Sequence, residues 1–396
     1  MDLEKAGPVF ELDDLWRIKR IDRAGICGVQ ERFPEDCDDA VERGEMLKIP
    51  RKLRIGEMLE IHYEKPDNII VVGMGGSAIS GIVLKDWLRD VMTIPIEVCG
   101  EYELPAYAKE KTLVFVLSYS GNTEEAISGF VDAVERECMV VAVSSDGVLQ
   151  EFSERLKIPF VKLPEKIQPR CAFPYLFFPL LMALKKLGII EPEREEVEEA
   201  IEVLREVRSE VKPESPTSRN LAKRLALEIK DSVPIIYGFG IYRGVARRMK
   251  TQFNENSKIL SKCEVFPELN HNEVVGWTGS DGLTRNFTVI LIRDKNEPSE
   301  IKARIDVTKK LVLEKRASKV IEVYARGRSK LARIFSVMYT GDFASVYLAI
   351  LYGVDPTPID VITRMKMELE KRTDIIEKLR NRLNFYLTKD FLDRSN

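Results

Sequence analysis

The sequence predicts an α/β protein built from two doubly wound parallel sheets and a C-terminal helix. Short runs of β-branched and other apolar residues recur along the chain, and amphipathic helical segments separate them. Runs that are apolar on both faces are typical of strands in a parallel sheet that helices cover on both sides. The rhythm occurs twice, and 396 residues are enough for two hydrophobic cores.

The first cycle of strands and helices occupies residues 68–164. Its apolar runs are NIIVVG (68–73), IEVCG (96–100), TLVFVLS (112–118), MVVAVSS (139–145) and FVKLP (160–164). Between the third and fourth runs, TEEAISGFVDAVERE has apolar residues at helical spacing. We therefore expect these runs to form one parallel sheet with helices on both faces.

The second cycle follows an acidic helical segment, EREEVEEAIEVLREVRSEV, and a proline-containing break, KPESPTS. Its apolar runs are PIIYGFG (234–240), FTVILIRD (287–294) and KVIEVYARG (319–327). The apolar run, Gly-x-Gly and helix around Gly238 repeat the pattern around Gly73, which favours two copies of one unit. The predicted segments are an N-terminal helical extension (1–45), a first domain (46–190), a linker helix (191–217) and a second domain with the C-terminal helix (218–396).

Composition and charge exclude several classes of function. The 61 basic and 64 acidic side chains give a net charge of −3, which offers no overall attraction for nucleic acid or an anionic membrane. The six cysteines are scattered without a CxxC pair, so neither a zinc site nor a disulfide framework is indicated. The N-terminal segment lacks an apolar signal core, and no apolar stretch reaches the roughly 20 residues of a membrane span. We expect a cytoplasmic protein that binds neither nucleic acid nor membranes.

Two polar turns, GMGGSAISG and SYSGNTEE, follow the first and third apolar runs of the first cycle. Ligands of doubly wound sheets bind at the carboxyl ends of the strands, where such turns converge. Backbone donors at helix N-termini, together with several hydroxyls, can hold a phosphate monoester without a lysine or a metal. The residues that would form this cage are Gly75, Gly76, Ser77, Ser118, Ser120 and Thr123.

Each turn alone also has a plainer interpretation. GMGGSA matches the dinucleotide pattern G-x-G-x-x-A, with Glu97 at the place of a ribose-binding acid. The second turn is typical of a helix cap, in which Asn122 or Thr123 caps a helix that begins with glutamates. A dinucleotide fold gives no reason for the second turn, so the two turns together favour the phosphate cage.

The two turns together resemble the sugar isomerase (SIS) fold, and the wider chain is similar to bacterial and archaeal bifunctional phosphoglucose/phosphomannose isomerases. The likeness spans roughly residues 30–370. It continues through QPRCAFPY (168–175), QFNENSK (252–258), ELNHNEVVGW (268–277) and YTGDFASVYLAILYGVDPTPID (339–360). It implies an aldose–ketose isomerase that interconverts glucose 6-phosphate, and mannose 6-phosphate too, with fructose 6-phosphate. It also implies a homodimer with a shared active site and no metal or coenzyme.

The resemblance assigns a role to each remaining site residue. The base falls on Glu255, and one carboxylate can serve both proton transfers of a cis-enediolate mechanism. His271 would assist ring opening, since an imidazole titrates near neutral pH. Arg170 would stabilise the enediolate charge by about 3 kcal/mol. The basic residue of the final helix matches Lys366 best, although Arg364 lies close to it in sequence.

Thr357, in the DPTP segment, is a candidate for tolerance of both configurations at C2 of the sugar. The main rival hypothesis is a regulator with this fold that binds sugar phosphate without converting it. Against that rival, no DNA-binding helical module or basic arm precedes the first cycle. An aminosugar isomerase is disfavoured because no amide-hydrolysing domain is found, and an NAD-dependent enzyme would leave the second turn unexplained.

Overall fold

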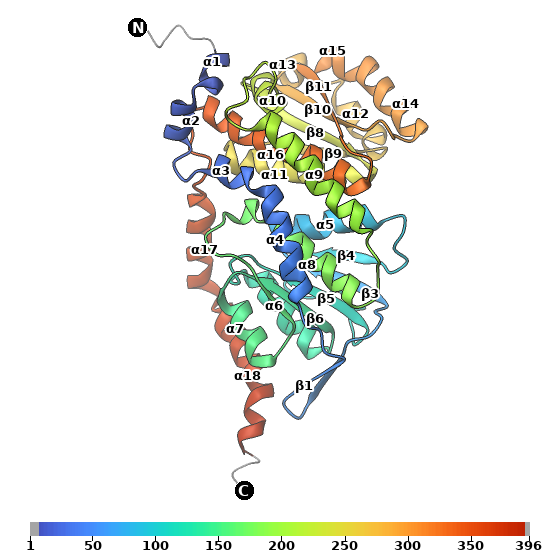
Figure 1. The fold of residues 1–396 in the computed structure, drawn as a ribbon, viewed down its shortest axis with the longest axis vertical. Coiled ribbons are helices and arrows are strands. Elements are labelled where there is room, and N and C mark those ends of the chain that lie inside the picture. Colours follow the sequence, from blue (N-terminus) through green and yellow to red (C-terminus); the bar gives the residue numbers. More distant parts are fainter. Residues whose placement is uncertain (1–7, 393–396) are drawn as a thin grey trace. The chain divides into compact units, whose positions relative to one another are not determined.

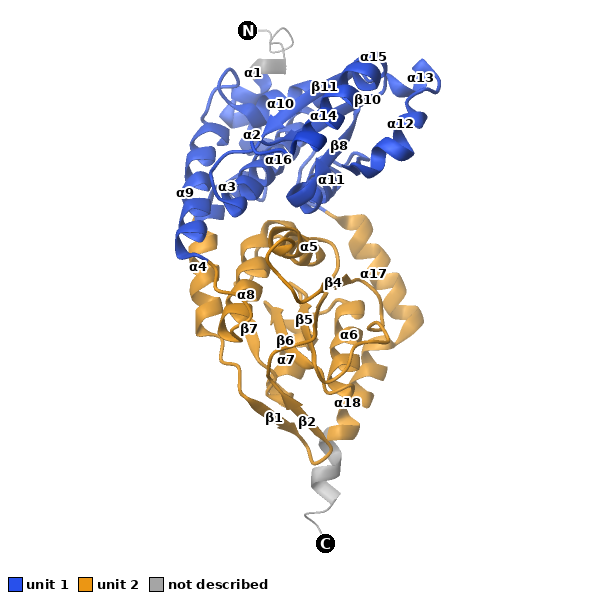
Figure 2. Cartoon of the chain, turned by 90° about the vertical axis from the view of Figure 1, so that its right-hand side faces the viewer, with its two compact units in different colours: residues 1–34, 193–358 blue, residues 35–192, 359–396 orange. Residues whose placement is uncertain are grey.

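The computed structural model describes residues 8–392, and the side chains of residues 11–386. Residues 1–7, which begin the predicted N-terminal extension, lie outside the described residues. The chain forms two compact units, shown in blue and orange in Figure 2. Unit 1 contains the chain up to Pro34 together with Glu193–Pro358, and unit 2 contains Glu35–Pro192 and the chain from Ile359.

Unit 2 is built on a five-stranded parallel sheet in the order β4-β3-β5-β6-β7. The strands are β3 (Asn68–Val72), β4 (Ile96–Cys99), β5 (Thr112–Leu117), β6 (Met139–Ser144) and β7 (Phe160–Lys162). Every residue of β5 and β6 is buried, which accounts for their uninterrupted apolar sequences. The predicted sheet is therefore confirmed.

Helices cover both faces of this sheet (Figure 1). They are α4 (Phe33–Met46), α5 (Gly76–Leu88), α6 (Glu124–Glu135), α7 (Gly147–Leu156) and α8 (Phe173–Lys186). A Cβ at Gly81 of α5 would lie 2.7 Å from the Val71 side chain, and one at Gly129 of α6 would lie 2.9 Å from Val72. Successive strand residues face opposite sides, so α5 and α6 pack on opposite faces of β3.

Unit 2 also contains a hairpin and the C-terminal helices. The hairpin pairs β1 (Lys52–Ile55) with β2 (Leu59–His62) in antiparallel register. The helix α17 (Asp360–Thr373) has no buried residue, whereas α18 (Ile375–Leu392) packs against α6. Ion pairs from Arg380 to Glu151 and from Arg382 to Glu135 fasten α18 to α7 and α6.

Unit 1 is built on a four-stranded parallel sheet in the order β11-β10-β8-β9. The strands are β8 (Val233–Phe239), β9 (Lys262–Phe266), β10 (Phe287–Arg293) and β11 (Lys319–Tyr324). The edge strand β9 is not among the predicted strands. Its residues are mostly half-buried and two of them are charged, so it lacks the apolar run that marks the others.

Many helices surround this second sheet. The long ones are α9 (Arg194–Val211), α10 (Leu221–Ile229), α11 (Arg243–Asn256), α14 (Ser299–Thr308) and α16 (Lys330–Leu351). The short ones are α1 (Pro8–Asp13), α2 (Leu15–Ile21), α3 (Ile26–Glu31), α12 (Glu273–Gly276), α13 (Asp281–Thr284), the π-helical turn Lys309–Leu313 and α15 (Glu314–Arg316).

The helix α16 is long and apolar enough to cross a membrane by the criteria of length and composition alone. The expectation that no segment reaches this limit is therefore wrong. The 18-residue window of α16 that meets these criteria is fully buried inside the protein. The helix packs against α9, α10 and α11, and a helix buried on all sides is apolar on all sides.

The division into units differs from the predicted segments at both ends of the chain. The prediction assigns residues 359–396 to the second domain, whereas the structure groups the described part of this segment, residues 359–392, with the first sheet in unit 2. The predicted linker helix, observed as α9, packs against α16 within unit 1. An amphipathic pattern shows that a helix packs on something, but it does not specify which sheet.

Candidate active site

The two polar turns of unit 2 form one rim at the carboxyl edge of its sheet. Strands β3 and β5 are parallel neighbours, with Val72 opposite Val116, so both chains leave the sheet at the same edge. A Cβ at Gly73 would lie 3.2 Å from the carbonyl oxygen of Leu117, so the turns are in contact. We call residues 73–77 and 118–123 the hydroxyl rim.

The turn Ser118–Thr123 is closed by its own hydroxyls. The Ser118 hydroxyl donates to Thr123 Oγ1 (2.9 Å), and the Asn122 N–H donates to Ser120 Oγ (3.3 Å). Gly121 has φ +68°, and a Cβ there would lie 1.6 Å from the Asp146 carbonyl oxygen, so only glycine fits. The small residues therefore allow the turn to be tight and place several hydroxyls within one rim.

The helix-cap interpretation of this turn holds for position only. Thr123 is the N-cap residue of α6 and glutamates follow it, but its side chain makes no capping hydrogen bond. The Asn122 amide oxygen instead accepts from the N–H of Val148 in α7 (3.1 Å). The Ser145 hydroxyl donates to the Tyr119 carbonyl oxygen (2.6 Å), which further ties this turn to the one after β6.

Arg170 lies against the first polar turn. It sits in the 3₁₀ turn Pro169–Cys171 after β7, and 3% of its surface is exposed. A Cβ at Gly76 would lie 3.3 Å from the Pro169 carbonyl oxygen and 3.6 Å from Arg170 Cα. The structure therefore brings the glycines, the hydroxyls and the backbone of Arg170 together from three segments of unit 2.

Tyr119 is a rim residue that the sequence reasoning missed. Its hydroxyl donates to the Pro164 carbonyl oxygen (2.9 Å) and accepts from the Ile167 N–H (2.7 Å). It thereby ties the hydroxyl rim to the segment that leads to Arg170. The signal available was a large aromatic residue between two serines, where a turn that only binds phosphate needs none.

Glu255 lies in unit 1, in the last turn of α11, and is half-buried. Lys258 follows in the left-handed region, with φ 58°. Its ammonium group donates to the carbonyl oxygens of Glu255 (2.5 Å) and Pro356 (2.9 Å). The end of α11 is thereby linked to the segment that carries Thr357, whose N–H donates to Asp355 Oδ1 (2.9 Å).

His271 also lies in unit 1, in the 3₁₀ turn Glu268–His271 after β9, and it is exposed. Both flanking asparagines brace this turn. The Asn270 amide donates to Thr308 Oγ1 (2.7 Å), and the Asn272 amide donates to a Glu268 carboxylate oxygen (3.0 Å). The backbone around His271 is therefore held while the side chain faces outward.

A partly buried cluster anchors the same loop, and the sequence reasoning did not single it out. The Glu273 carboxylate accepts from the Tyr237 hydroxyl (2.7 Å) and from the Lys262 ammonium (2.5 Å). The Trp277 indole N–H donates to the Tyr237 oxygen (2.9 Å). Burial and the neighbouring carboxylate raise the pKa of Tyr237, so its hydroxyl remains a donor at ordinary pH.

Comparison with known proteins agrees with this geometry. The family described as "SIS domain" matches residues 62–158, and "Bacterial phospho-glucose isomerase C-terminal SIS domain" matches residues 218–369. A bifunctional phosphoglucose/phosphomannose isomerase from Caldicellulosiruptor bescii is 41% identical over 83% of this chain and 97% of its own length. A protein of the same name from Aquifex aeolicus is 36% identical over 76% of this chain and 90% of its own.

The chain belongs to the bifunctional phosphoglucose/phosphomannose isomerase family. The predicted family and fold are thus confirmed. Solved structures agree on the fold. A glucose-6-phosphate isomerase like protein from Thermus thermophilus aligns with a TM-score of 0.56 at 21% identity, covering 87% of this chain and 96% of its own. A hypothetical protein from the same organism aligns with a TM-score of 0.67 at 15% identity, covering 90% and 94%.

Among the phosphoglucose/phosphomannose isomerase site residues assigned by resemblance, the basic residue of the final helix is the least defined. Lys366 and Arg364 both lie on α17 in unit 2, and both are exposed. Burial therefore does not distinguish them. Within residues 11–386, no three His, Cys, Asp or Glu side chains are grouped so that they could share a metal ion.

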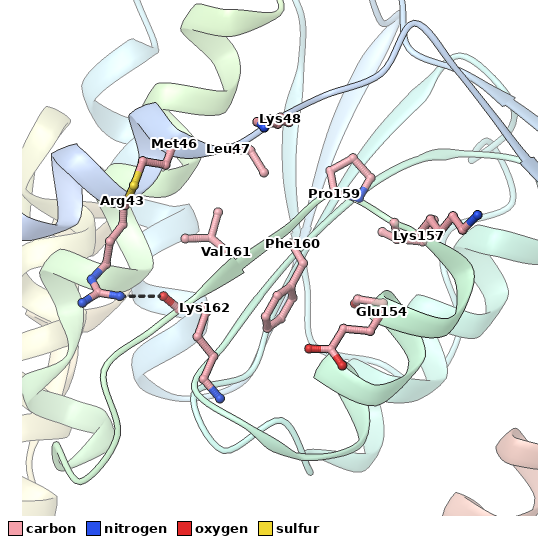
Figure 3. Close-up of a pocket in the computed structure, with 12 residues that line it drawn as sticks. Arg43, Met46, Leu47, Lys48, Glu154, Lys157, Pro159, Phe160, Val161 and Lys162 are labelled. Atoms are coloured by element: carbon pink, nitrogen blue, oxygen red, sulfur yellow. Dashed lines mark hydrogen bonds between the residues drawn. The ribbon is translucent and has the colours of Figure 1, made fainter.

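A cavity of about 440 Å³ in unit 2 is separate from these residues (Figure 3). The ends of α4 and α7 and the edge strand β7 line it, and none of the predicted site residues does. Arg43 closes one side by donating to the Lys162 carbonyl oxygen (3.1 Å).

Proposed function

We propose that this protein is an aldose–ketose isomerase that interconverts glucose 6-phosphate and mannose 6-phosphate with fructose 6-phosphate. The observation that carries the proposal is the match along almost the full length of a relative named for both activities, 41% identical. The hydroxyl rim supports it, because it has the chemistry that a phosphate monoester requires. The non-catalytic alternative has no support among the relatives.

In this proposal the hydroxyl rim of unit 2 holds the substrate phosphate. Ser77, Ser118, Ser120 and Thr123 offer hydroxyl donors, and the N-termini of α5 and α6 add backbone N–H groups and favourable helix dipoles. The Ser118 hydroxyl donates to Thr123 Oγ1 in the free protein. A phosphate oxygen would replace that acceptor and leave both hydroxyls free to donate to it.

The chemistry then uses His271, Glu255 and Arg170. His271 assists opening of the sugar ring. Glu255 removes the proton from C2 of the aldose, the C–H electrons form the C1–C2 double bond, and the carbonyl oxygen becomes an enediolate oxygen. The proton on the C2 oxygen moves to the C1 oxygen, the protonated Glu255 returns its proton to C1, and the electrons left on the C2 oxygen form the carbonyl of the ketose, so no oxidant or reductant is consumed. Arg170 stabilises the enediolate charge, an effect of about 3 kcal/mol for one well-placed donor.

Acceptance of both sugars follows from the intermediate. An enediolate is planar at C2, so it has lost the configuration that distinguishes glucose from mannose. A proton can return to either face if the base reaches both or the sugar rotates. We place Thr357 beside this step because Lys258 links its segment to the end of α11.

We also propose a cytoplasmic homodimer in which His271 serves the site of the partner copy, without any metal. The exposure of His271 on a firmly anchored loop supports the shared site. Arg170 and the donors of the hydroxyl rim supply the charge stabilisation that a metal would otherwise provide. The basic residue of α17, Lys366 or Arg364, would add a second cation to the site.

One experiment tests the proposed function. Purified protein treated with EDTA is incubated separately with mannose 6-phosphate and fructose 6-phosphate, and the products are followed by NMR. We expect glucose 6-phosphate from both. Binding of either sugar phosphate without conversion would instead identify a non-catalytic binding protein.

A further inference from the structure

Behind the helix that carries Glu255 lies a buried polar network in unit 1. Arg248 in α11 and Asp342 in α16 form an ion pair in which 2% and 0% of the respective side chains is exposed. The guanidinium donates from Nη2 (2.7 Å) and from Nε (3.0 and 3.2 Å). The Gln252 amide donates to the same carboxylate (3.0 Å).

The network continues along the same face of α11 to its last turn. The Asn256 amide donates to Ser345 Oγ (2.9 Å), and the Ser345 hydroxyl donates to the Asp342 carbonyl oxygen (2.6 Å). The Ser257 hydroxyl donates to the Ser345 carbonyl oxygen (2.6 Å). All of these groups are buried. Arg248, Gln252 and Asn256 follow one another at four-residue spacing, so the contacts with α16 extend over more than two turns of α11.

Stability alone does not explain this network. Burial raises the pKa of Asp342, whereas Arg248 and Gln252 oppose that rise. Removing two charges from water costs as much as their attraction returns, and apolar residues of similar size commonly stabilise a core as well or better. What directional hydrogen bonds add is a fixed rotation and register of one helix against another.

A fixed rotation of α11 about its axis would fix the position of the Glu255 carboxylate. It lies about 60° around the helix from Gln252, at the edge of the face that the network holds. Its carboxylate lies roughly 6 Å from the helix axis, so a 10° rotation of α11 would move it by about 1 Å. A displacement of that size costs on the order of 100-fold in rate.

We propose that Asp342 is a positioning residue for Glu255, acting through Arg248, Gln252 and Asn256. This inference rests on the proposed role of Glu255 as the catalytic base. A separate hydrogen bond joins the last turn of α11 to the segment that follows it: Asn254 Oδ1 accepts from the Ser261 N–H (3.0 Å). The network therefore sets rotation, while the connecting loop sets where the helix ends.

The test replaces the charged part of the network with apolar side chains of similar size. The triple variant Arg248→Met, Gln252→Met and Asp342→Leu leaves no buried charge unpaired. We expect it to fold, to keep KM for fructose 6-phosphate within about threefold, and to lose 10- to 100-fold in kcat. In glucose 6-phosphate labelled with deuterium at C2, we expect less label to be retained at C1 of the product, because a displaced acid exchanges with water before it returns the deuteron.

The matched control is Arg333→Met with Asp294→Leu, which removes another buried ion pair of α16 (2.7 Å) far from Glu255 in sequence. We expect its kcat and its retained label to match the wild type, after correction for the folded fraction by circular dichroism. If the triple variant keeps kcat within about threefold and retains the wild-type amount of label, or loses no more than the control, the positioning role is excluded.

If the triple variant fails to fold, the same two measurements are made on Ser345→Ala. We expect its kcat and its retained label to fall, by less than in the triple variant. The wild-type measurement keeps the two proposals apart. A wild-type protein without isomerase activity would refute the proposed function, whereas an active wild type with an unaffected triple variant would refute only the positioning role.

Discussion

The carboxyl edges of the two sheets share a backbone conformation but differ in the side chains that they present. At the end of β3 in unit 2 and at the end of β8 in unit 1, a Gly-x-Gly segment leads into a helix, and its second glycine has φ +50° at Gly75 and +47° at Gly240. Two residues beyond that glycine, unit 2 has Ser77. At the same place unit 1 has Tyr242, whose hydroxyl donates to the Asp294 carboxylate.

The difference decides which edge can receive an anion. Arg333 also donates to Asp294 (2.7 Å), so the edge of unit 1 already contains its own carboxylate and the donors that satisfy it. A phosphate there would meet a like charge. The edge of unit 2 offers hydroxyls and helix N-termini instead. Duplication of a fold unit therefore copies the backbone of a site without copying its ligand.

The largest expected effect is the loss of kcat when the proposed base is removed. Glu255→Gln should lower kcat by at least 100-fold, because the amide cannot accept a proton from carbon. KM for fructose 6-phosphate should change little, because the phosphate is held in unit 2. Steady-state kinetics measures both. Glu228→Gln, an exposed ion-pair residue of unit 1, is the matched control and should be fully active. Turnover by Glu255→Gln above about a tenth of wild type would remove it as the base.

A somewhat smaller loss is expected from the cation of unit 2. Arg170→Met should lower kcat by about 100-fold, corresponding to about 3 kcal/mol of lost enediolate stabilisation. Arg170→Lys keeps the charge but not the planar fork, and should recover part of the loss. If both variants raise KM and leave kcat unchanged, Arg170 binds the phosphate and does not act on the enediolate.

Substitutions at each of the two edges contrast them directly. Ser118→Ala with Thr123→Val should raise KM about 30-fold, because two donors at about 1 kcal/mol each are lost. Tyr242→Phe alters the corresponding edge of unit 1, and should leave KM unchanged while lowering the unfolding free energy by about 1–3 kcal/mol, since Asp294 loses a buried donor. A change of KM in Tyr242→Phe would show that unit 1 also binds phosphate.

Much of the fold was predictable from sequence, whereas the interactions that distinguish the two edges were not. Apolar runs specify strands such as β5 because its residues are buried on both faces. The strand β9 was missed because partial burial leaves no such run. The Gly-x-Gly repeat around Gly73 and Gly238 indicated a duplication, and the turn Ser118–Thr123 indicated a phosphate site. These signals are local in sequence.

The pairings that complete the candidate site join residues far apart in the chain. Arg248 pairs with Asp342, and Tyr242 with Asp294, over separations that no periodicity reports. Lys366 illustrates the same limit, because a basic helix offers several equivalent cations and only tertiary contacts can select one. Resemblance supplied the roles of Glu255 and His271, which the residue pattern alone would not have given.

The smallest expected effect concerns pH at the edge of unit 1. Burial, then Asp294, raises the pKa of Tyr242 above its ordinary value. A folded-state pKa above the unfolded value gives stability that is fully present below pH ~10 and is lost as the pH rises. The difference in unfolding free energy between wild type and Tyr242→Phe should thus be constant from pH 7 to about 9.5 and shrink above it.

Denaturant titrations at each pH measure this difference. Ser77, at the equivalent place in unit 2, does not titrate, so a Ser77→Ala variant should show a pH-independent difference over the same range. A constant difference for Tyr242→Phe up to pH ~11 would mean that its hydroxyl is not held as the structure shows.

Unit 2 is proposed to hold the phosphate while unit 1 supplies the base, and calorimetry can separate these two roles. The titration uses the inactive Glu255→Gln protein with fructose 6-phosphate. We expect one sugar phosphate to bind per chain, with an affinity that falls about tenfold or more when Ser118→Ala and Thr123→Val are added. Two sites per chain, or an affinity that the added rim substitutions leave unchanged, would contradict this division of roles.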